Sequence, residues 1–356
     1  MSYGQPARRE ADVESPLVNL RTRIIGTGSA LPSRCVTNFD LAEHLDTSDE
    51  WIRERVGIQA RYICGEGEST VSLAAEATRR ALEMAQIAPS DIDLIVFGTF
   101  TPGQTLPSAA AMLASELGVS EVVAFDLQAA CSGFLFGLVT AEALMTSLNC
   151  RTALVVGADT LSTVVNWSDR DTAVLFGDGA GVCILQRDNA SSLPLIETSY
   201  LRTAGDGANF ITCSEPRRVQ ESNPFSSAAM VPEEESSKEN NFIHMKGRSV
   251  FKSGVQLMTT SVEKVLEQAK LGIDDVALFI PHQSNIRMMQ NVAQNVGITD
   301  ESRIATTIHT VGNTSAASIP MTLDHYSRSG HIAQNDRLLL TAVGSGMSYG
   351  SLLLRW

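Results

Sequence analysis

An internal repeat constrains the fold of this 356-residue chain more than any other feature of its sequence. In the first half an apolar strand ends at Thr99, and Cys131 follows it by 32 residues at the start of an apolar helix. In the second half an apolar strand ends at His282, and Asn313 follows it by 31 residues, again before a helix. We therefore expect two copies of one α/β unit whose strand-end loops bring Cys131, His282 and Asn313 together. Chance similarity between the loops of an α/β protein is the alternative.

Buried strands are expected where short apolar runs end at glycine, proline or aspartate. The clearest runs cover residues 94–97, 122–125, 153–156 and 304–308. Glycine-rich turns at 177–181 and 344–346 each precede a further apolar run. Helical segments alternate with these runs, which is typical of a layered α/β protein.

The chain is long enough for one large core made of two parts. The repeat predicts an N-terminal half over 21–197, with the cysteine, and a C-terminal half over 198–356, with the histidine and the asparagine. Residues 1–20 are polar and aperiodic, so we expect a flexible tail there. The stretch 213–241 carries three prolines and an acidic run, which predicts a long surface loop.

The net charge of −13 excludes nucleic acid as the main partner, because binding phosphates needs a positive field. A local basic patch of Lys246, Arg248 and Lys252, with Arg287 joining in the fold, would suit an acidic partner; solvated surface charge is the alternative. No run approaches the roughly 20 apolar residues of a membrane-spanning helix, and the N-terminus lacks the apolar core of a secretory signal. We expect a cytoplasmic protein that binds no membrane.

Cys131 is the candidate nucleophile. Its neighbours over 129–134 read Ala-Ala-Cys-Ser-Gly-Phe, after a buried strand and before a helix that is apolar almost all round. The positive end of the helix dipole favours a thiolate and lowers the thiol pKa. The same setting suits a cysteine that only packs in the core. The six cysteines show no paired spacing, so neither a metal site nor a disulfide is predicted.

His282 and Asn313 are the candidate partners of this cysteine. A histidine at a strand end can donate a hydrogen bond to a bound carbonyl or transfer a proton. Asn313 lies in Gly-Asn-Thr-Ser, a pattern that is also typical of a turn with a helix N-cap. His309 lies close to Asn313 but lacks a partner motif, so we rank it lower. Each residue alone is more often structural, and the hypothesis depends on the triplet.

The turn Gly344-Ser345-Gly346 is a candidate oxyanion hole. Glycines tolerate unusual dihedral angles, so such a turn can bring a backbone N–H close to a ligand. The N–H groups of Cys131 and Ser345 would together hold the oxyanion of a thioester. A plain glycine-rich turn explains the motif equally well.

Five motifs in the same order make the chain resemble the β-ketoacyl-acyl-carrier-protein synthase III family. The likeness runs from about Ile24 to Trp356. The motifs are Thr47-Ser48-Asp49-Glu50-Trp51-Ile52, Ala129-Ala130-Cys131-Ser132-Gly133-Phe134, Phe176-Gly177-Asp178-Gly179-Ala180-Gly181, Pro281-His282-Gln283 and Gly312-Asn313-Thr314-Ser315-Ala316-Ala317-Ser318.

The resemblance implies a five-layered αβαβα thiolase-like fold, usually as a homodimer, and an acyltransferase that starts fatty acid synthesis. It implies that Cys131 takes an acyl group from acyl-CoA. His282 and Asn313 would then stabilise the enolate that forms when malonyl-acyl-carrier protein loses carbon dioxide. No metal or cofactor is implied, because decarboxylation supplies the carbanion.

The resemblance also implies binding roles for further residues. Thr47, Trp51, Arg55 and Arg170 would contact coenzyme A, and Asn285 and Phe176 would support the catalytic site. Leu106 would lie in the acyl pocket. Lys252 and Arg287 would dock the carrier protein.

Departures from the family pattern leave the starter unit and the acceptor open. Val311 and Val343 replace a histidine and a phenylalanine, Ser345 stands where glycine or alanine is usual, and Leu106 replaces a phenylalanine. The main alternative is an acyltransferase or condensing enzyme of secondary metabolism with a different acceptor. A non-catalytic partner subunit is a weaker one, since such subunits typically lose the cysteine. A biosynthetic thiolase would need a second cysteine near the C-terminus, and the last here is Cys213.

Overall fold

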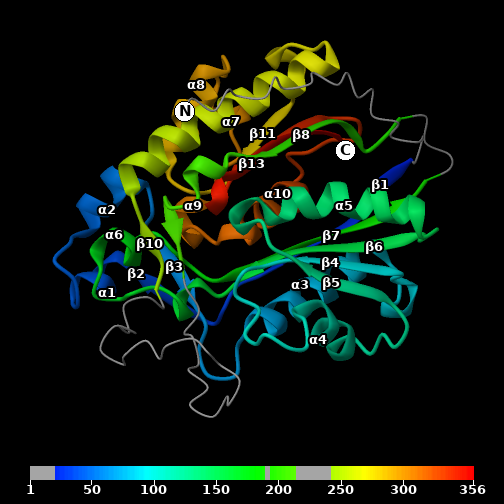
Figure 1. Ribbon diagram of the computed structural model, residues 1–356, viewed down its shortest axis with the longest axis horizontal. Helices are drawn as coiled ribbons and strands as arrows, with labels where there is room; N and C mark the ends of the chain where they lie inside the picture. Colours follow the sequence, from blue (N-terminus) through cyan, green and yellow to red (C-terminus); the bar gives the residue numbers. More distant parts are fainter. Residues whose placement is uncertain (1–20, 189–192, 214–241) are drawn as a thin grey trace, which may run out of the picture.

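The computed structural model describes residues 21–188, 193–213 and 242–356. The predicted tail over 1–20 and all but the first residue of the predicted loop over 213–241 lie outside the described residues. Two β-sheets, with helices between them and on their outer faces, give five layers (Figure 1). This is the layered arrangement that the sequence predicts.

The first sheet has five strands in the order β1-β7-β6-β4-β5. Their bounds are Thr22–Ala30 for β1, Leu94–Gly98 for β4, Val123–Leu127 for β5, Thr152–Asp159 for β6 and Gly179–Arg187 for β7. Strand β4 runs parallel to β5 and β6, and β7 runs antiparallel to β6 and β1. Strands β4 and β6 are buried throughout, which is why the sequence shows them as continuous apolar runs.

The second sheet repeats this topology in the order β11-β12-β13-β8. Its strands are β8 (Ile196–Thr203), β11 (Leu278–Pro281), β12 (Arg337–Val343) and β13 (Ser348–Arg355). They take the places of β1, β4, β6 and β7, with the same parallel and antiparallel pairings. The two sheets are therefore copies of one arrangement.

The strand predicted over 304–308 does not form, and this prediction was wrong. Ile304 makes a single bridge to Phe279, at the place where the first sheet has β5. Beyond it, Gln283 Oε1 accepts the N–H groups of Thr307 and Ile308 at 2.8 and 3.1 Å. These bonds replace a sheet partner, and helix α9 (Ile308–Val311) begins there.

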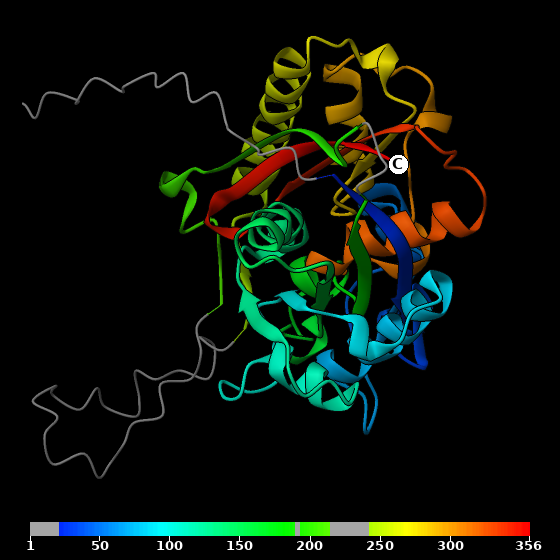
Figure 2. The same ribbon diagram turned by 90° about the vertical axis from the view of Figure 1, so that its right-hand side faces the viewer.

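Helices cover both sheets and fill the space between them (Figures 1 and 2). Helices α3 (Thr70–Ala85) and α4 (Ala109–Glu116) pack on the first sheet, and α7 (Gly247–Ala269) packs on the second with α8 (Ile286–Asn295) beside it. The middle layer consists of α5 (Gly133–Ser147) and α10 (Ser318–Arg328). Figure 2 shows α5 along its axis, between the sheets.

The stretch Ala130–Ser147 is long and apolar enough to cross a membrane, by length and composition alone. The prediction that no segment approaches this limit was therefore wrong. The side chains of Phe134, Leu135 and Leu138 in this stretch are fully buried in the protein core. Contact with a sheet on either side explains why this helix is apolar almost all round.

Short elements surround one end of the middle layer. They are β2 (Arg34–Thr37), α1 (Asn38–Ala42), α2 (Asp49–Val56), β3 (Ala60–Ile63), α6 (Arg170–Ala173), β9 (Ile211–Thr212) and β10 (His244–Met245). Strands β2 and β3 form a hairpin, and β9 pairs with β10. Together with the ends of α7 and α8, these elements surround the functional site.

Candidate functional site

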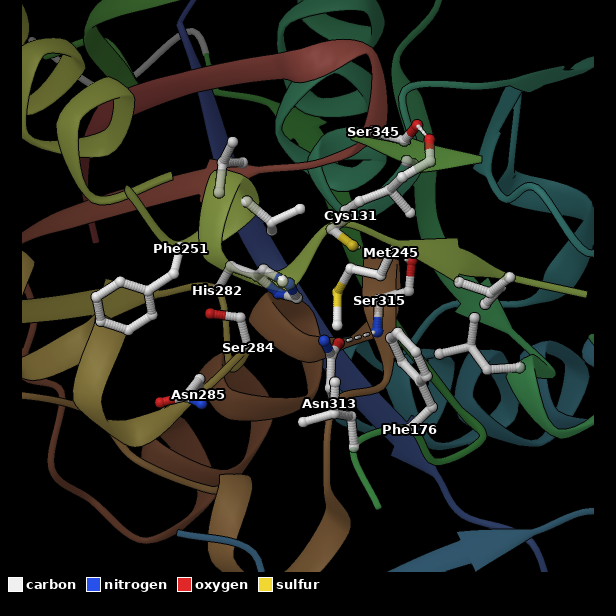
Figure 3. A pocket seen from close by; sticks show the side chains of 18 of the residues that line it. Cys131, Phe176, Met245, Phe251, His282, Ser284, Asn285, Asn313, Ser315 and Ser345 are labelled. Carbon is white, nitrogen blue, oxygen red and sulfur yellow. Dashed lines mark hydrogen bonds between the residues drawn. The ribbon is translucent and has the colours of Figure 1, made fainter. Parts of the chain in front are cut away.

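Cys131, His282 and Asn313 line one cavity of about 500 Å³. Their side chains point toward a shared centre (Figure 3). The rest of the wall is mainly apolar, and its larger side chains are Phe100, Leu161, Val174, Phe176, Ile211, Met245, Phe251, Met288, Val343 and Met347. The convergence predicted from the repeat is therefore present in the structure.

Cys131 lies in a short 3₁₀ turn, Ala130–Ser132, that leads directly into α5. The residue before it, Ala130, has a φ of 47°, in the left-handed region that non-glycine residues rarely adopt. Gly344 packs against the nucleophile, because a Cβ added there would lie 2.8 Å from the backbone nitrogen of Cys131. The glycine turn predicted as half of an oxyanion hole thus lies beside the Cys131 N–H.

The thiol of Cys131 does not have the low pKa that the sequence predicted. Burial, and to a smaller extent the nearby carboxylate of Asp159, raises the pKa of Cys131 to about 11. A hydrogen bond from Ser315 Oγ, 3.5 Å from Cys131 Sγ, acts in the opposite direction. The prediction was wrong because it counted the helix dipole and omitted the burial of the sulfur.

His282 is held at the end of β11 as a buried imidazole. The backbone N–H of His282 donates to Thr341 O at 2.8 Å, and only 1% of the residue is exposed. The Nδ1 atom lies 2.7 Å from Ser318 Oγ, which also accepts the N–H of Gln283 at 3.4 Å. The Ser318 hydroxyl can therefore donate its proton to Nδ1, which leaves Nδ1 as the acceptor and places the ring proton on Nε2. The Nε2–H group then faces the cavity. Burial lowers the pKa of His282 to about 3, so the ring is neutral.

Asn313 is fixed through both its backbone and its side chain. It forms a bridge with Phe176, in which its N–H donates to Leu175 O at 2.9 Å and its carbonyl accepts Gly177 N–H at 3.0 Å. Its Oδ1 accepts the N–H of Ser315 at 2.9 Å (Figure 3). Because the oxygen is engaged, the Nδ2 donor remains for the cavity.

The two predicted supporting residues act differently. Phe176 lines the cavity and supports Asn313 through the bridge between their backbones. Asn285 also lines the cavity, but its Oδ1 caps α8 by accepting Arg287 N–H at 2.9 Å. Its Nδ2 donates to Arg55 O at 3.4 Å. Asn285 therefore orients α8 and the mouth of the cavity.

Trp51 stands in the wall of the cavity, between two cations. The guanidinium carbons of Arg55 and Arg170 lie 5.7 and 5.0 Å from its ring centroid, within the range of cation–π contacts. Thr47 Oγ1 is buried and has no hydrogen-bond partner in the part of the chain that the structure describes. A buried hydroxyl without a partner is a group that a bound ligand can satisfy.

Basic side chains lie on the exposed surface around this mouth. Gly247 and Arg248, at the start of α7, line the cavity, and Lys252 is exposed one turn further on. Arg287 of α8 is exposed as well, and its guanidinium lies 3.6 Å from a carboxylate oxygen of Glu54. The predicted basic patch is therefore at the surface, beside the entrance.

Several residues named from the sequence do not line this cavity: Thr47, Arg55, Leu106, Arg170, Lys246, Lys252, Arg287 and His309. Leu106 is 83% exposed, so its acyl-pocket role stays a prediction. His309 bonds through Nδ1 to Gly57 O at 2.6 Å, away from the cavity, in agreement with its lower rank.

Sequence reasoning missed four residues near the reacting atoms: Ser315, Ser318, Asp159 and Cys213. The two serines belong to the motif that includes Asn313, and their hydroxyl contacts become visible only in three dimensions. Asp159 is a charged residue at the end of a buried apolar strand, and this unusual position could have been recognised from the sequence. Cys213 lines the cavity and adjoins a segment outside the described residues.

Comparisons with known proteins agree on one family. Residues 125–205 match the family described as 3-oxoacyl-[acyl-carrier-protein (ACP)] synthase III, and residues 266–356 match its C-terminal counterpart. A β-ketoacyl-[acyl-carrier-protein] synthase III of Rhizorhabdus wittichii is 41% identical over 94% of this chain and 99% of that protein.

Solved structures give the same result. The 3-oxoacyl-[acyl-carrier-protein] synthase III of Aquifex aeolicus is 37% identical with a TM-score of 0.84, covering 94% of this chain and 100% of that one. The priming β-ketosynthase of the R1128 polyketide pathway is 31% identical with a TM-score of 0.84, covering 94% and 97%.

Proposed function

The chain belongs to the β-ketoacyl-acyl-carrier-protein synthase III family of condensing acyltransferases, and we propose that Cys131, His282 and Asn313 carry its reaction. The observation that supports these roles most directly is the convergence of the three side chains on one cavity. In the proposed sequence, an acyl-CoA first acylates Cys131. The acyl group then condenses with the enolate released from malonyl-acyl-carrier protein, which gives a β-ketoacyl product.

The first half-reaction uses the cysteine and the turn beside it. The sulfur of Cys131 attacks the thioester carbonyl, and the N–H groups of Cys131 and Ser345 stabilise the oxyanion. The close packing of Gly344 on the Cys131 nitrogen supports this pairing. The Cys131 proton ends on the sulfur of the departing coenzyme A, so the exchange of one thioester for another is balanced.

The second half-reaction uses two neutral donors. His282, through Nε2, and Asn313, through Nδ2, donate to the thioester oxygen of the malonyl group as negative charge develops there. The bonds from Ser318 and Ser315 pre-orient these donors, which reduces the reorganisation needed in the transition state. Loss of carbon dioxide supplies the carbanion, so the proposed reaction needs no metal or cofactor.

The mouth of the cavity suits the two partners that carry the acyl groups. We assign Trp51, Arg55, Arg170 and Thr47 to coenzyme A, because a stacked ring, two cations and a buried hydroxyl match a nucleotide with phosphates. We assign Lys252 and Arg287 to the acidic acyl-carrier protein. Both are exposed, Lys252 one turn of α7 beyond Arg248 and Arg287 two residues after Asn285, and both Arg248 and Asn285 line the cavity; this placement supports the docking role.

We also propose that the enzyme is a cytoplasmic homodimer. Strand β5 is at the edge of the first sheet, and its first residue, Val123, is 42% exposed. Leu106 is 83% exposed, and a large exposed apolar side chain with an open strand edge suits a subunit interface. In such a dimer Leu106 would meet the partner subunit, so its acyl-pocket role belongs to the dimer.

Intact-protein mass spectrometry after incubation with acyl-CoAs of graded length tests the proposal. We expect wild type to gain the mass of one acyl group and Cys131→Ala to gain none. Addition of malonyl-acyl-carrier protein should then remove the added mass and yield a β-ketoacyl product. If Cys131 remains unmodified by every acyl-CoA and acyl-carrier donor, the proposed function fails.

A priming enzyme of polyketide synthesis is the second candidate, because the R1128 priming β-ketosynthase matches as much of this chain as the Aquifex enzyme does. Val343, which lines the cavity where the family often has phenylalanine, is compatible with a different starter group. The same series of acyl-CoAs separates the two functions by the acyl group that loads fastest.

A further inference from the structure

The hydroxyl of Ser315 lies between two groups that carry or can acquire negative charge. Its Oγ lies 3.5 Å from Cys131 Sγ. The same hydroxyl is a hydrogen-bond partner of the Asp159 carboxylate, whose Oδ2 also accepts Ala316 N–H at 3.3 Å. A serine hydroxyl has one proton, so it can donate to the sulfur or to the carboxylate, but not to both.

Asp159 is fully buried at the end of β6 and holds fixed donors. Its Oδ1 accepts the hydroxyls of Thr99 and Thr101, each at 2.9 Å, and the N–H groups of Phe100 and Thr101 at 3.0 and 3.3 Å. Burial raises the pKa of Asp159, and these donors act against that rise by favouring the ionised carboxylate. The carboxylate therefore opposes a second negative charge on Cys131 nearby.

Ser315 cannot easily move away from this position. Its φ is 51°, in the left-handed region, and its N–H is engaged by Asn313 Oδ1. The turn also packs tightly on β6, because a Cβ added at Gly157 would lie 2.2 Å from Ala316 O. The backbone of Ser315 is therefore fixed, and its hydroxyl changes partner by rotation about the side-chain bonds.

We propose that Ser315 is a catalytic residue whose hydroxyl, 3.5 Å from Cys131 Sγ, donates to that sulfur as it becomes a thiolate and turns to Asp159 once the sulfur is acylated. The proton stays on the serine oxygen throughout, so no bond of Ser315 breaks. The switch stabilises the thiolate against the buried charge of Asp159 during acylation and releases the sulfur once it is acylated. The cavity wall also carries the neutral ring of His282, the thiol of Cys213, the carboxylate of Asp171 and the guanidinium of Arg248. Only the identity of the acyl donor in this inference rests on the proposed function.

The pH dependence of Cys131 alkylation by iodoacetamide tests the proposal, with peptide mass spectrometry to follow this cysteine alone. Ser315→Ala keeps the Cβ and the backbone bond to Asn313 and removes only the hydroxyl. We expect its alkylation at pH 8 to slow about tenfold, because a hydrogen bond to a charged group is lost. Ser284→Ala is the matched control, since its hydroxyl lines the same cavity and contacts Met288 and not Cys131. We expect this variant to alkylate like wild type.

Decarboxylation of a malonyl thioester gives a second readout. Ser315→Ala should slow decarboxylation much less than alkylation, because the backbone bond that orients Asn313 is unchanged, whereas general distortion of the site would slow both reactions equally. Equal alkylation profiles for wild type and Ser315→Ala would overturn the proposal, as would equal slowing of alkylation and decarboxylation. Iodoacetamide is not an acyl donor, so the alkylation result stands even if every acyl-CoA fails to load and the proposed function is abandoned.

Discussion

Lowering the pH tests whether His282 is buried as a neutral imidazole. Burial lowers the pKa of His282 from 6.5 to about 3 in the folded chain. Between these values the unfolded chain binds a proton that the folded chain does not, so the free energy of unfolding decreases as the pH falls. The stabilisation is fully present above about pH 6.5 and is lost progressively toward pH 3.

The size of this effect follows from the two pKa values of His282. A single site with these values lowers the free energy of unfolding by about 2.5 kcal/mol between pH 7 and pH 4.5, since one pKa unit corresponds to about 1.4 kcal/mol. Other groups add their own pH dependence. The comparison is therefore with His282→Gln, which places a polar side chain near Ser318 but cannot titrate.

Urea unfolding followed by tryptophan fluorescence, at one protein concentration and at both pH values, measures the difference. We expect wild type to lose about 2.5 kcal/mol more than His282→Gln on going from pH 7 to pH 4.5. Equal losses would show that the folded chain protonates His282 as readily as the unfolded chain does. In that case the ring is a cation in acid, and the argument for a neutral donor is refuted.

Three further changes test other parts of the site. Asn313→Ala should spare acylation of Cys131 and abolish decarboxylative condensation. Mass spectrometry of the loaded enzyme measures the first reaction, and product analysis measures the second. Loss of both activities would contradict the assigned role. Gly344→Ala places a Cβ 2.8 Å from the Cys131 nitrogen and should slow acylation at least tenfold in a chain that still melts cooperatively. Arg170→Ala removes a contact 5.0 Å from the Trp51 ring and should raise KM for acyl-CoA about fivefold with little change in kcat. An unchanged KM would argue against a coenzyme A site at Trp51.

The first sheet could be predicted from the sequence because of how its strands are buried. Strands β4 and β6 are covered on both faces, so they read as continuous apolar runs with clear ends. The stretch 304–308 is also apolar and β-branched, with two threonines and two isoleucines. It forms no strand because the side chain of Gln283 binds the backbone of Thr307 and Ile308. These hydrogen bonds join residues more than 20 positions apart in the sequence, so no local sequence pattern reveals them.

The convergence of the proposed catalytic triplet could be predicted because each member ends a strand or opens a helix, and such positions can be recognised in the sequence. The surroundings that determine the pKa values and the tautomer of these side chains could not be predicted. The pKa of Cys131 depends on burial and on Asp159, and the tautomer of His282 depends on Ser318, 36 residues away. Local sequence reports the helix dipole but not the cavity around the sulfur, which is why the predicted direction of the thiol pKa was wrong.

The repeat also explains why the active site needs both halves of the chain. Ala130 and Ser315 open equivalent turns before the two middle helices α5 and α10, and both have a left-handed φ, of 47° and 51°. Such a conformation costs roughly 1–2 kcal/mol in a non-glycine residue and persists only where the surroundings fix it. Here the two turns pack against one another, since Ser315 Oγ of one lies 3.5 Å from Cys131 Sγ of the other. One copy thus supplies the nucleophile, the other supplies the hydroxyl and the amide, and neither copy alone contains a complete site.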